Sequence, residues 1–105
     1  MAHLQAISGA AFGKRFEIEK SQVVLGRHPD CDVTIEVGAV SRQHARINSE
    51  GEGYTLEDLK SRNGTFLNGQ EVKAPSKLRD GDLIRICDVE YQFHSEQQES
   101  SFLSE

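Results

Sequence analysis

Residues 61–69 read Ser-Arg-Asn-Gly-Thr-Phe-Leu-Asn-Gly, and no other stretch of the chain says as much about its fold. Two Asn-Gly pairs lie in it, Asn63-Gly64 and Asn68-Gly69. Such pairs favour tight turns because both residue types tolerate left-handed backbone. The second pair follows a short apolar run and predicts the turn of a β-hairpin. The stretch is therefore typical of a protein made of short strands and tight turns.

The rest of the chain repeats apolar side chains with a period of two, which is the period of a β-strand. Val89, Tyr91 and Phe93 give the clearest example, since polar residues separate them. Further alternation or short apolar runs occur at residues 16–18, 23–25, 33–35, 45–47, 54–56 and 83–86. Gly, Pro, Asn and Asp divide these runs, and no window keeps the apolar stripe of a helix. The pattern predicts an all-β fold, an antiparallel β-sandwich or barrel.

Length and composition favour one globular domain followed by a tail. The chain has 105 residues, of which 36% are hydrophobic and 28% are charged. These values are ordinary for a folded protein with a modest core. No apolar run approaches the roughly 20 residues that cross a bilayer. We expect the domain over residues 1–94 and a polar C-terminal tail or linker over residues 95–105, where alternation stops.

The charge distribution favours a small anion site over a nucleic-acid groove. The formal net charge is −5, whereas nucleic-acid binders carry a broad basic surface. Aromatic residues make up 7% of the chain, with no Trp to stack on bases. Basic residues gather instead in small groups at residues 27–28, 42–46 and 60–62. Composition alone would also allow these groups to be ordinary solvated surface charges.

Three turn-rich segments carry the side chains suited to such an anion. They are Gly26-Arg27, residues 41–44 and residues 61–64, separated by runs that are typical of strands. Arginine offers a planar fork of donors that matches phosphate, and serine and asparagine add shorter donors. Segments of this kind are expected to meet as loops at one end of a β-domain. The sequence thus predicts a site for one small anion within a peptide.

An enzyme is a second alternative class, beside a nucleic-acid binder. Ser41 and His44, with Asp58 as a third member, suggest a nucleophile relay, but no Gly-x-Ser-x-Gly turn accompanies them. No Gly-x-x-x-x-Gly-Lys-[Ser/Thr] phosphate loop occurs, and residues 28–32 lack a recognisable metal spacing. We therefore expect no catalytic residue, no cofactor and no metal.

The cysteines and the start of the chain bear on location. Only Cys31 and Cys87 occur, too few for a disulfide framework. Residues 1–5 lack the basic and apolar regions of a secretory signal. A reduced, cytoplasmic setting is the expectation.

Taken in order, the motifs closely resemble the forkhead-associated domain. The matching segments are Gly26-Arg27, Ser41-Arg42-Gln43-His44-Ala45, Ser61-Arg62-Asn63-Gly64-Thr65 with Asn68-Gly69, and the closing run at residues 78–86. The resemblance covers roughly Leu4 to His94. It implies an eleven-stranded β-sandwich whose loops at one end bind phosphothreonine peptides in Ser/Thr kinase signalling. One departure is Cys87, which stands where the family often has glycine before the last hairpin.

The resemblance also implies roles for individual residues. Arg27 matches the arginine that grips the phosphate, Ser41 the serine that faces it, and Asn63 the asparagine that holds the peptide main chain. Arg42 adds a second donor, and Arg62 occupies a position that often faces the ligand. Ser61 is assigned to the binding loop with a less defined role. The residues expected to support the loops are Gly26, His44, Gly64, Thr65, Asn68 and Gly69. Without the family match, Arg27 would be a surface arginine paired with Asp30 or Asp32.

The expected partner is a phosphothreonine-containing protein, with no nucleic acid and no membrane. The family commonly reads the third residue after phosphothreonine, and the candidates for that task lie in residues 36–40 and 73–76. The tail contains four serines and no threonine, so self-binding through it is not expected. An effector domain fused after the tail remains open. So does a scaffold that keeps the fold and binds through a sheet face without phosphate.

Overall fold

The structure is a computed structural model that describes residues 2–9, 11–51 and 53–95. All regular elements in this part of the chain are strands, eleven in number. They are β1 (Ala2–Ala6), β2 (Arg15–Ile18), β3 (Gln22–Gly26), β4 (Val33–Thr34), β5 (Ala45–Glu50), β6 (Gly53–Asp58), β7 (Thr65–Leu67), β8 (Gln70–Glu71), β9 (Ser76–Leu78), β10 (Leu83–Ile86) and β11 (Val89–Ser95). The predicted all-β class and the strand count implied by the resemblance are confirmed.

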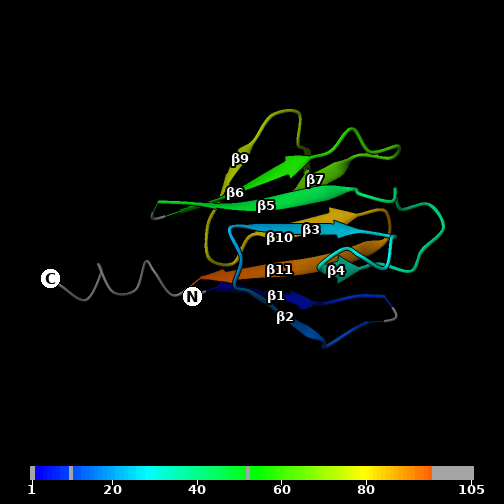
Figure 1. Ribbon diagram of the computed structural model, residues 1–105, viewed down its shortest axis with the longest axis horizontal. Helices are drawn as coiled ribbons and strands as arrows, with labels where there is room; N and C mark the ends of the chain where they lie inside the picture. The colour runs from blue at the N-terminus through cyan, green and yellow to red at the C-terminus, as the bar shows by residue number, and fades with distance from the viewer. Residues whose placement is uncertain (1, 10, 52, 96–105) are drawn as a thin grey trace, which may run out of the picture.

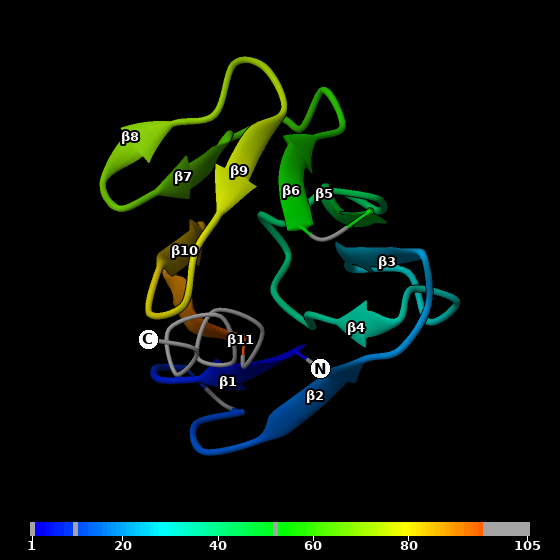
Figure 2. The same ribbon diagram turned by 90° about the vertical axis from the view of Figure 1, so that its left-hand side faces the viewer.

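The strands form two sheets that face each other (Figure 1). One sheet has the order β2-β1-β11-β10-β7-β8 and the other the order β4-β3-β5-β6-β9. All pairings are antiparallel except that of β3 with β4, which is parallel. Figure 2, turned by a quarter from the first view, shows the two layers enclosing the space between them. Of the two architectures that the alternating pattern predicts, a sandwich or a barrel, the structure is the β-sandwich that the resemblance implies.

The core lies between the sheets and is built by alternate residues of most strands, whereas both residues of β8 are exposed. β11 shows this best, because Val89, Tyr91 and Phe93 are buried while the residues between them are partly exposed. β5 and β6 contribute Ala45, Ile47 and Leu56 in the same way. The remaining buried apolar residues are Ala2, Leu4, Ala6, Ile18, Val23, Leu25, Val33, Ile35, Val40, Val72, Leu78, Ile84 and Ile86. Burial of one such side chain contributes about 1.5–3 kcal/mol.

Two tight turns set the register of the strand pairs β7–β8 and β10–β11. The β7–β8 hairpin turns at Asn68 and Gly69, whose φ angles are 51° and 87°, as the Asn-Gly pair predicts. The β10–β11 hairpin turns at Cys87 and Asp88, and Cys87 has a φ of 56°. A left-handed backbone at this position explains why the family often has glycine here.

Some elements were not foreseen from the pattern. β1 was not identified because its apolar residues are mostly alanines, which carry little strand signal, although it pairs with both β2 and β11. The strands β8 and β9 show no alternation because two or three residues are too few to show a period of two. The expected tail lies outside the described residues from residue 96 onward, and the described chain ends in β11 at Ser95. The domain boundary therefore stays a prediction.

In the parts of the chain that the structure describes, no helix is long and apolar enough to span a membrane.

Candidate functional site

Three loops that carry the predicted site residues meet at one end of the sandwich. They are the β3–β4 loop (residues 27–32), the β4–β5 loop (residues 35–44) and the β6–β7 loop (residues 59–64). In Figure 1 they lie at the right-hand end, opposite the β5–β6 turn. Hydrogen bonds join the β3–β4 loop to the β4–β5 loop and the β4–β5 loop to the β6–β7 loop. The prediction that these loops would gather at one end is correct.

Arg27 is held at the centre of this end by its own backbone and by one side-chain nitrogen. Its N–H donates to the Ser41 carbonyl at 3.0 Å, and its Nε donates to the Val40 carbonyl at 3.0 Å. The bond at Nε fixes the direction of the guanidinium and leaves the two terminal amino groups as donors. The residue is exposed, so these donors face solvent. Their planar arrangement suits two oxygens of one phosphoryl group.

The alternative expectation for Arg27, a surface ion pair, is not what the structure contains. Asp32 instead pairs with Lys20 at 2.6 Å and accepts the N–H of Val24 at 2.9 Å. Asp30 lies beside His28, whose Nδ1 accepts the N–H of Asp30 at 3.0 Å. Within the described residues Arg27 has no carboxylate partner.

Gly26 lets the β3–β4 and β4–β5 loops approach closely. A β-carbon at this position would lie 2.1 Å from the carbonyl oxygen of Arg42 and 3.0 Å from the sulfur of Cys31. The same Arg42 carbonyl accepts bonds from the N–H of His28 at 3.2 Å and from the thiol of Cys31 at 3.1 Å. The glycine is therefore required by packing and not by an unusual φ angle. Arg42 is anchored through its main chain, and its side chain extends into solvent.

Ser41 links the β4–β5 loop to the β6–β7 loop. Its Oγ accepts the backbone N–H of Arg62 at 3.0 Å. A hydroxyl that accepts in this way keeps its own proton for donation to a further acceptor. The Arg62 side chain is exposed beside this bond. Ser41 and Arg62 are thus brought together with Arg27, which bonds to Ser41 through the main chain.

His44 lies behind these donors and is fully buried. Its Nδ1 accepts the N–H of Ser41 at 3.0 Å, and its Nε2 lies 2.8 Å from the carbonyl oxygen of Gly64. Acceptance at Nδ1 and donation from Nε2 together define a neutral ring. The imidazole therefore ties the β4–β5 loop to the β6–β7 loop through two backbone groups.

Asn63 forms a second bridge between these two loops, closer to solvent. Its Nδ2 donates to the Ala39 carbonyl at 2.8 Å and lies 3.9 Å from the sulfur of Cys87. The donor side of the amide is occupied by these contacts, and the carbonyl oxygen Oδ1 is left as an acceptor. A main-chain N–H of a bound peptide is the natural complement to that oxygen.

Asp58 organises the β6–β7 loop from its first turn. One carboxylate oxygen accepts the hydroxyls of Ser61 at 2.5 Å and Thr65 at 2.7 Å, and the other accepts the N–H of Ser61 at 3.1 Å. The Ser61 hydroxyl also accepts the N–H of Gly64 at 2.9 Å. Both capacities of that hydroxyl are therefore used inside the loop. The prediction that Ser61 contacts a ligand stays a prediction, and its observed contacts serve the loop.

The protonation of Asp58 follows from these contacts. Burial raises the pKa of its carboxyl, but hydrogen bonds from the Ser61 hydroxyl, the Thr65 hydroxyl and the Ser61 N–H outweigh that effect. The pKa of Asp58 lies below its ordinary value as a result. The carboxylate is thus ionised at neutral pH and keeps accepting all three bonds.

The loop end carries three arginines, and the described residues offer them no carboxylate partner. Arg27, Arg42 and Arg62 are exposed, and none of them pairs with a carboxylate in the described part of the chain. Elsewhere, by contrast, Arg46 pairs with Glu57 at 2.7 Å on the outer face of its sheet. These three guanidinium groups stand on loops that also carry the exposed carboxylates of Asp30 and Glu36, and their donors are available to an anion.

The geometry does not build a nucleophile relay from the serine, histidine and aspartate considered above. Both ring nitrogens of His44 bind backbone groups, so neither is directed to the Ser41 hydroxyl. Asp58 bonds to Ser61 and Thr65, and among the described residues no hydrogen bond joins it to His44. No group of three or more His, Cys, Asp or Glu side chains suited to a metal occurs among the described residues.

Sequence reasoning missed two contributors to this end of the molecule. The first is Asp58, whose carboxylate holds the β6–β7 loop together. The available sequence signal is an aspartate three residues before a serine, which is typical of a turn capped by the aspartate side chain. The second is the pair of backbone carbonyls at Ala39 and Val40, which orient Asn63 and Arg27. Main-chain acceptors leave no trace in residue identity, so no sequence signal could have revealed them.

The fold and this loop end define a class of protein: a β-sandwich module whose loops present arginine and serine donors and an asparagine acceptor at one end. The sequence profile described as FHA domain matches residues 23–87. The chain therefore belongs to the forkhead-associated (FHA) family.

Curated relatives support the assignment. The chain is 40% identical over 78 residues to the oxoglutarate dehydrogenase inhibitor of Corynebacterium jeikeium, covering 74% of this chain and 54% of that protein. It is 36% identical over 83 residues to the transcriptional regulatory protein EmbR of Mycobacterium tuberculosis, covering 79% of this chain and 21% of EmbR. The chain thus spans about half of one relative and about a fifth of the other.

Solved structures agree in fold. Mycobacterium tuberculosis EmbR in complex with a low affinity phosphopeptide superposes with a TM-score of 0.82 at 34% identity, over 89% of this chain and 24% of EmbR. A structure from an analysis of phosphothreonine-dependent FHA domain interactions gives a TM-score of 0.82 at 31% identity, over 90% of this chain and 95% of that one.

Proposed function

We propose that this chain is a phosphopeptide-binding module that recognises phosphothreonine on a partner protein in a Ser/Thr kinase pathway. Arg27 holds the phosphate through its terminal amino groups, and the Ser41 hydroxyl donates to the same group. Arg42 and Arg62 add charge from the two neighbouring loops. Asn63 accepts a main-chain N–H of the peptide. The partner is therefore a phosphothreonine-containing protein, as membership of the family implies.

One observation carries this proposal. Three guanidinium groups without carboxylate partners, on an acidic chain, stand on loops that are joined by bonds through Ser41, His44 and Asn63. Arg27, whose Nε is already held by the Val40 carbonyl, loses little entropy when an anion binds. The residue roles of Gly26, Gly64, Thr65, Asn68 and Gly69 are proposed to be support, since each contributes to a turn or a close approach.

The finer parts of the proposal concern catalysis and location. We propose a non-catalytic module, supported by the backbone contacts that engage both nitrogens of His44. We propose a cytoplasmic setting, supported by Cys31 and Cys87, which are both free thiols.

A binding experiment on the wild-type protein tests the function. Three degenerate peptide pools differ only at one fixed residue, which is phosphothreonine, phosphoserine or unmodified threonine. We expect measurable binding of the phosphothreonine pool, weaker binding of the phosphoserine pool and none of the unmodified pool. Equal binding of the phosphorylated and unmodified pools would contradict phosphate recognition. It would favour the scaffold that binds through a sheet face.

A further inference from the structure

The outer strands of the two sheets differ in how open they are to a further strand. One sheet ends in β2 and β8, and the other ends in β4 and β9. β4 and β8 have two residues each, and β9 has three and follows Pro75, which has no backbone N–H to donate. β2 has four residues and is the longest of these edges. It is therefore the edge best suited to pair with another chain.

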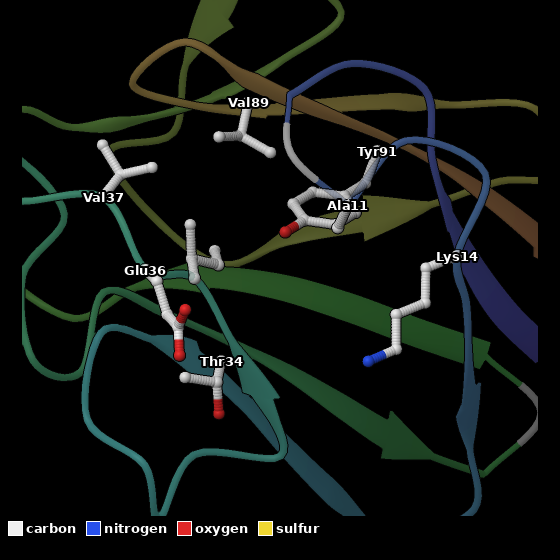
Figure 3. A pocket seen from close by; sticks show the side chains of 8 residues that line it. Ala11, Lys14, Thr34, Glu36, Val37, Val89 and Tyr91 are labelled. Atoms are coloured by element: carbon white, nitrogen blue, oxygen red, sulfur yellow. The ribbon is translucent and has the colours of Figure 1, made fainter.

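No strand of the described chain covers the outer edge of β2. In Figures 1 and 2 this strand lies at the margin of the molecule. A pocket of about 440 Å³ separates the turn before β2 from the edge of the other sheet. Its lining includes Ala11 and Lys14 of that turn, Thr34 of β4, Val37 of the following loop and Tyr91 of β11, and Figure 3 shows Lys14 and Thr34 on different sides of the space. β4 therefore does not close over the start of β2.

The register of β1 and β2 directs half of the β2 backbone groups to the open edge. The N–H of Ala6 donates to the Lys14 carbonyl at 2.9 Å, so these two residues form a hydrogen-bonded pair. Bonded and non-bonded pairs alternate along an antiparallel ladder, so the backbone of Phe16 also bonds to β1. The N–H and C=O groups of Arg15 and Glu17 consequently point away from β1, to the side where the sheet ends.

The side chains of β2 are self-complementary about Phe16. Arg15 and Glu17 are exposed on the outer face of the sheet and form an ion pair with each other at 2.5 Å. Phe16 points to the opposite face, where it is partly buried and its ring centre lies 6.1 Å from that of Tyr91. Read in the reverse direction from Phe16, the strand presents a carboxylate where the first strand presents a guanidinium.

We propose that β2 pairs with β2 of a second copy of this chain, antiparallel and across a two-fold axis at Phe16. Arg15 of each copy then lies opposite Glu17 of the other, and each such pair exchanges both of its backbone hydrogen bonds. The ion pairs within the strands become ion pairs between them, and the two Phe16 rings meet on the inner face. The two six-stranded sheets join into one continuous sheet.

The order of charges identifies the partner. An unrelated strand could use the backbone groups of the edge, but a second copy brings the matching charges in the matching order. An isologous contact of this kind closes on itself, so it yields a dimer and not a fibre. The pairing leaves the loop end free and is independent of the proposed function.

Sedimentation equilibrium of the whole chain over a range of concentrations tests the pairing. We expect wild type to show a reversible monomer–dimer equilibrium with a Kd below about 1 mM, as for a small transient interface. Arg15→Glu and Glu17→Arg should each weaken the dimer by about tenfold or more, because each places like charges opposite one another at both pairs. The double variant Arg15→Glu/Glu17→Arg restores opposite charges at both pairs, so its Kd should lie within about threefold of wild type.

Two further measurements separate the edge from general effects. Arg79→Glu, an exposed reversal outside β2 with the same change in net charge as Arg15→Glu, should dimerise as wild type. In wild type, hydrogen exchange of the Arg15 and Glu17 amides should slow as the protein concentration rises.

Four results would overturn the proposal. They are a monomer at every concentration up to about 1 mM, a dimer that neither single reversal weakens, a double variant that dimerises no better than the single ones, and a dimer whose Arg15 and Glu17 amides stay unprotected. None of them affects phosphate binding at the loop end, which the peptide pools test separately.

Discussion

Gly26 shows how one residue controls the distance between two loops. The space that a side chain at Gly26 would need is occupied by the carbonyl of Arg42, which also accepts hydrogen bonds from His28 and Cys31. The neighbouring Arg27 depends on that distance, because its own N–H bonds to Ser41 across the same gap. The geometry of the donor set is thus fixed by a residue that does not touch the ligand in our proposal.

Gly26→Ala is expected to lower the free energy of unfolding by about 1–3 kcal/mol, the usual cost of overpacking. It should also weaken phosphopeptide binding, since the two loops must separate. Gly38→Ala is the matched control, because a β-carbon there meets nothing within 4 Å and its free energy of unfolding should change by less than about 0.5 kcal/mol. Urea denaturation of both variants measures the difference, and equal stabilities would contradict the close-approach argument.

The carboxylate of Asp58 gives the β6–β7 loop a dependence on pH. Its pKa in the folded protein lies below the ordinary value of about 3.9, so the folded state binds this proton less readily than the unfolded state. The stabilisation is present above that ordinary value and is lost as the pH falls through the lower folded pKa. Asp32 and Glu57 also have lowered pKa values and add to the acid sensitivity of the wild type.

Asp58→Asn isolates this contribution. We expect the variant to be about 1–3 kcal/mol less stable at neutral pH. The two oxygens of the carboxylate accept from two hydroxyls and an N–H, whereas an amide has only one oxygen that can accept. The gap between variant and wild type should narrow as the pH falls below about 4. Denaturant unfolding across this pH range checks both statements. A gap that stays constant with pH would mean that the charge of Asp58 does not matter.

At the scale of elements, turns rather than strands carry the departures from regular structure. The Asn68-Gly69 turn adopts the left-handed conformations that its residues favour, and the Asn68 side chain accepts the N–H of Leu83 at 3.0 Å. The Cys87 turn adopts a left-handed conformation with a residue that does not favour it. A β-carbon in this region costs about 1–2 kcal/mol.

Cys87→Gly is therefore expected to raise the free energy of unfolding by up to about 1 kcal/mol, after the greater entropy of glycine in the unfolded chain is subtracted. Cys87→Ala keeps the β-carbon and removes the thiol, so its stability should stay within about 0.5 kcal/mol of wild type. Thermal unfolding of the two variants compares them directly. A less stable glycine variant would show that the sulfur contact with Asn63 outweighs the backbone strain.

How far the sequence predicts these elements depends on their length. β11 could be predicted because seven residues show a full period of two, and the β7–β8 turn because its two residues have a strong backbone preference. β8 could not, since two exposed residues carry no pattern. The site motifs predicted which loops meet, whereas the bonds of Arg27 and Asn63 depend on carbonyls that any residue could supply. The pocket lined by Ala11, Val37 and Tyr91 brings together residues from distant parts of the chain, and no local sequence motif indicates that they lie side by side.

At the scale of the whole molecule, the sandwich acts as a rigid base for one charged end. The two sheets share a continuous apolar core, while the loops at that end are joined mainly by hydrogen bonds through His44, Ser41 and Asn63. Net negative charge disfavours long polyanions, and in our proposal the three arginines bind a single compact anion. This division between body and loop end is consistent with reading one phosphorylated residue in a peptide.

The most direct test of this account is a two-by-two comparison of affinities. A phosphothreonine peptide and its unphosphorylated twin are titrated against wild type and Arg27→Ala, with an amide correlation spectrum of each protein to show that the sandwich is intact. The account predicts that the phosphate strengthens binding to wild type by about 100-fold or more and that this gain largely disappears in Arg27→Ala. The same phosphate-dependent gain in both proteins would contradict the assignment of Arg27 to the phosphate.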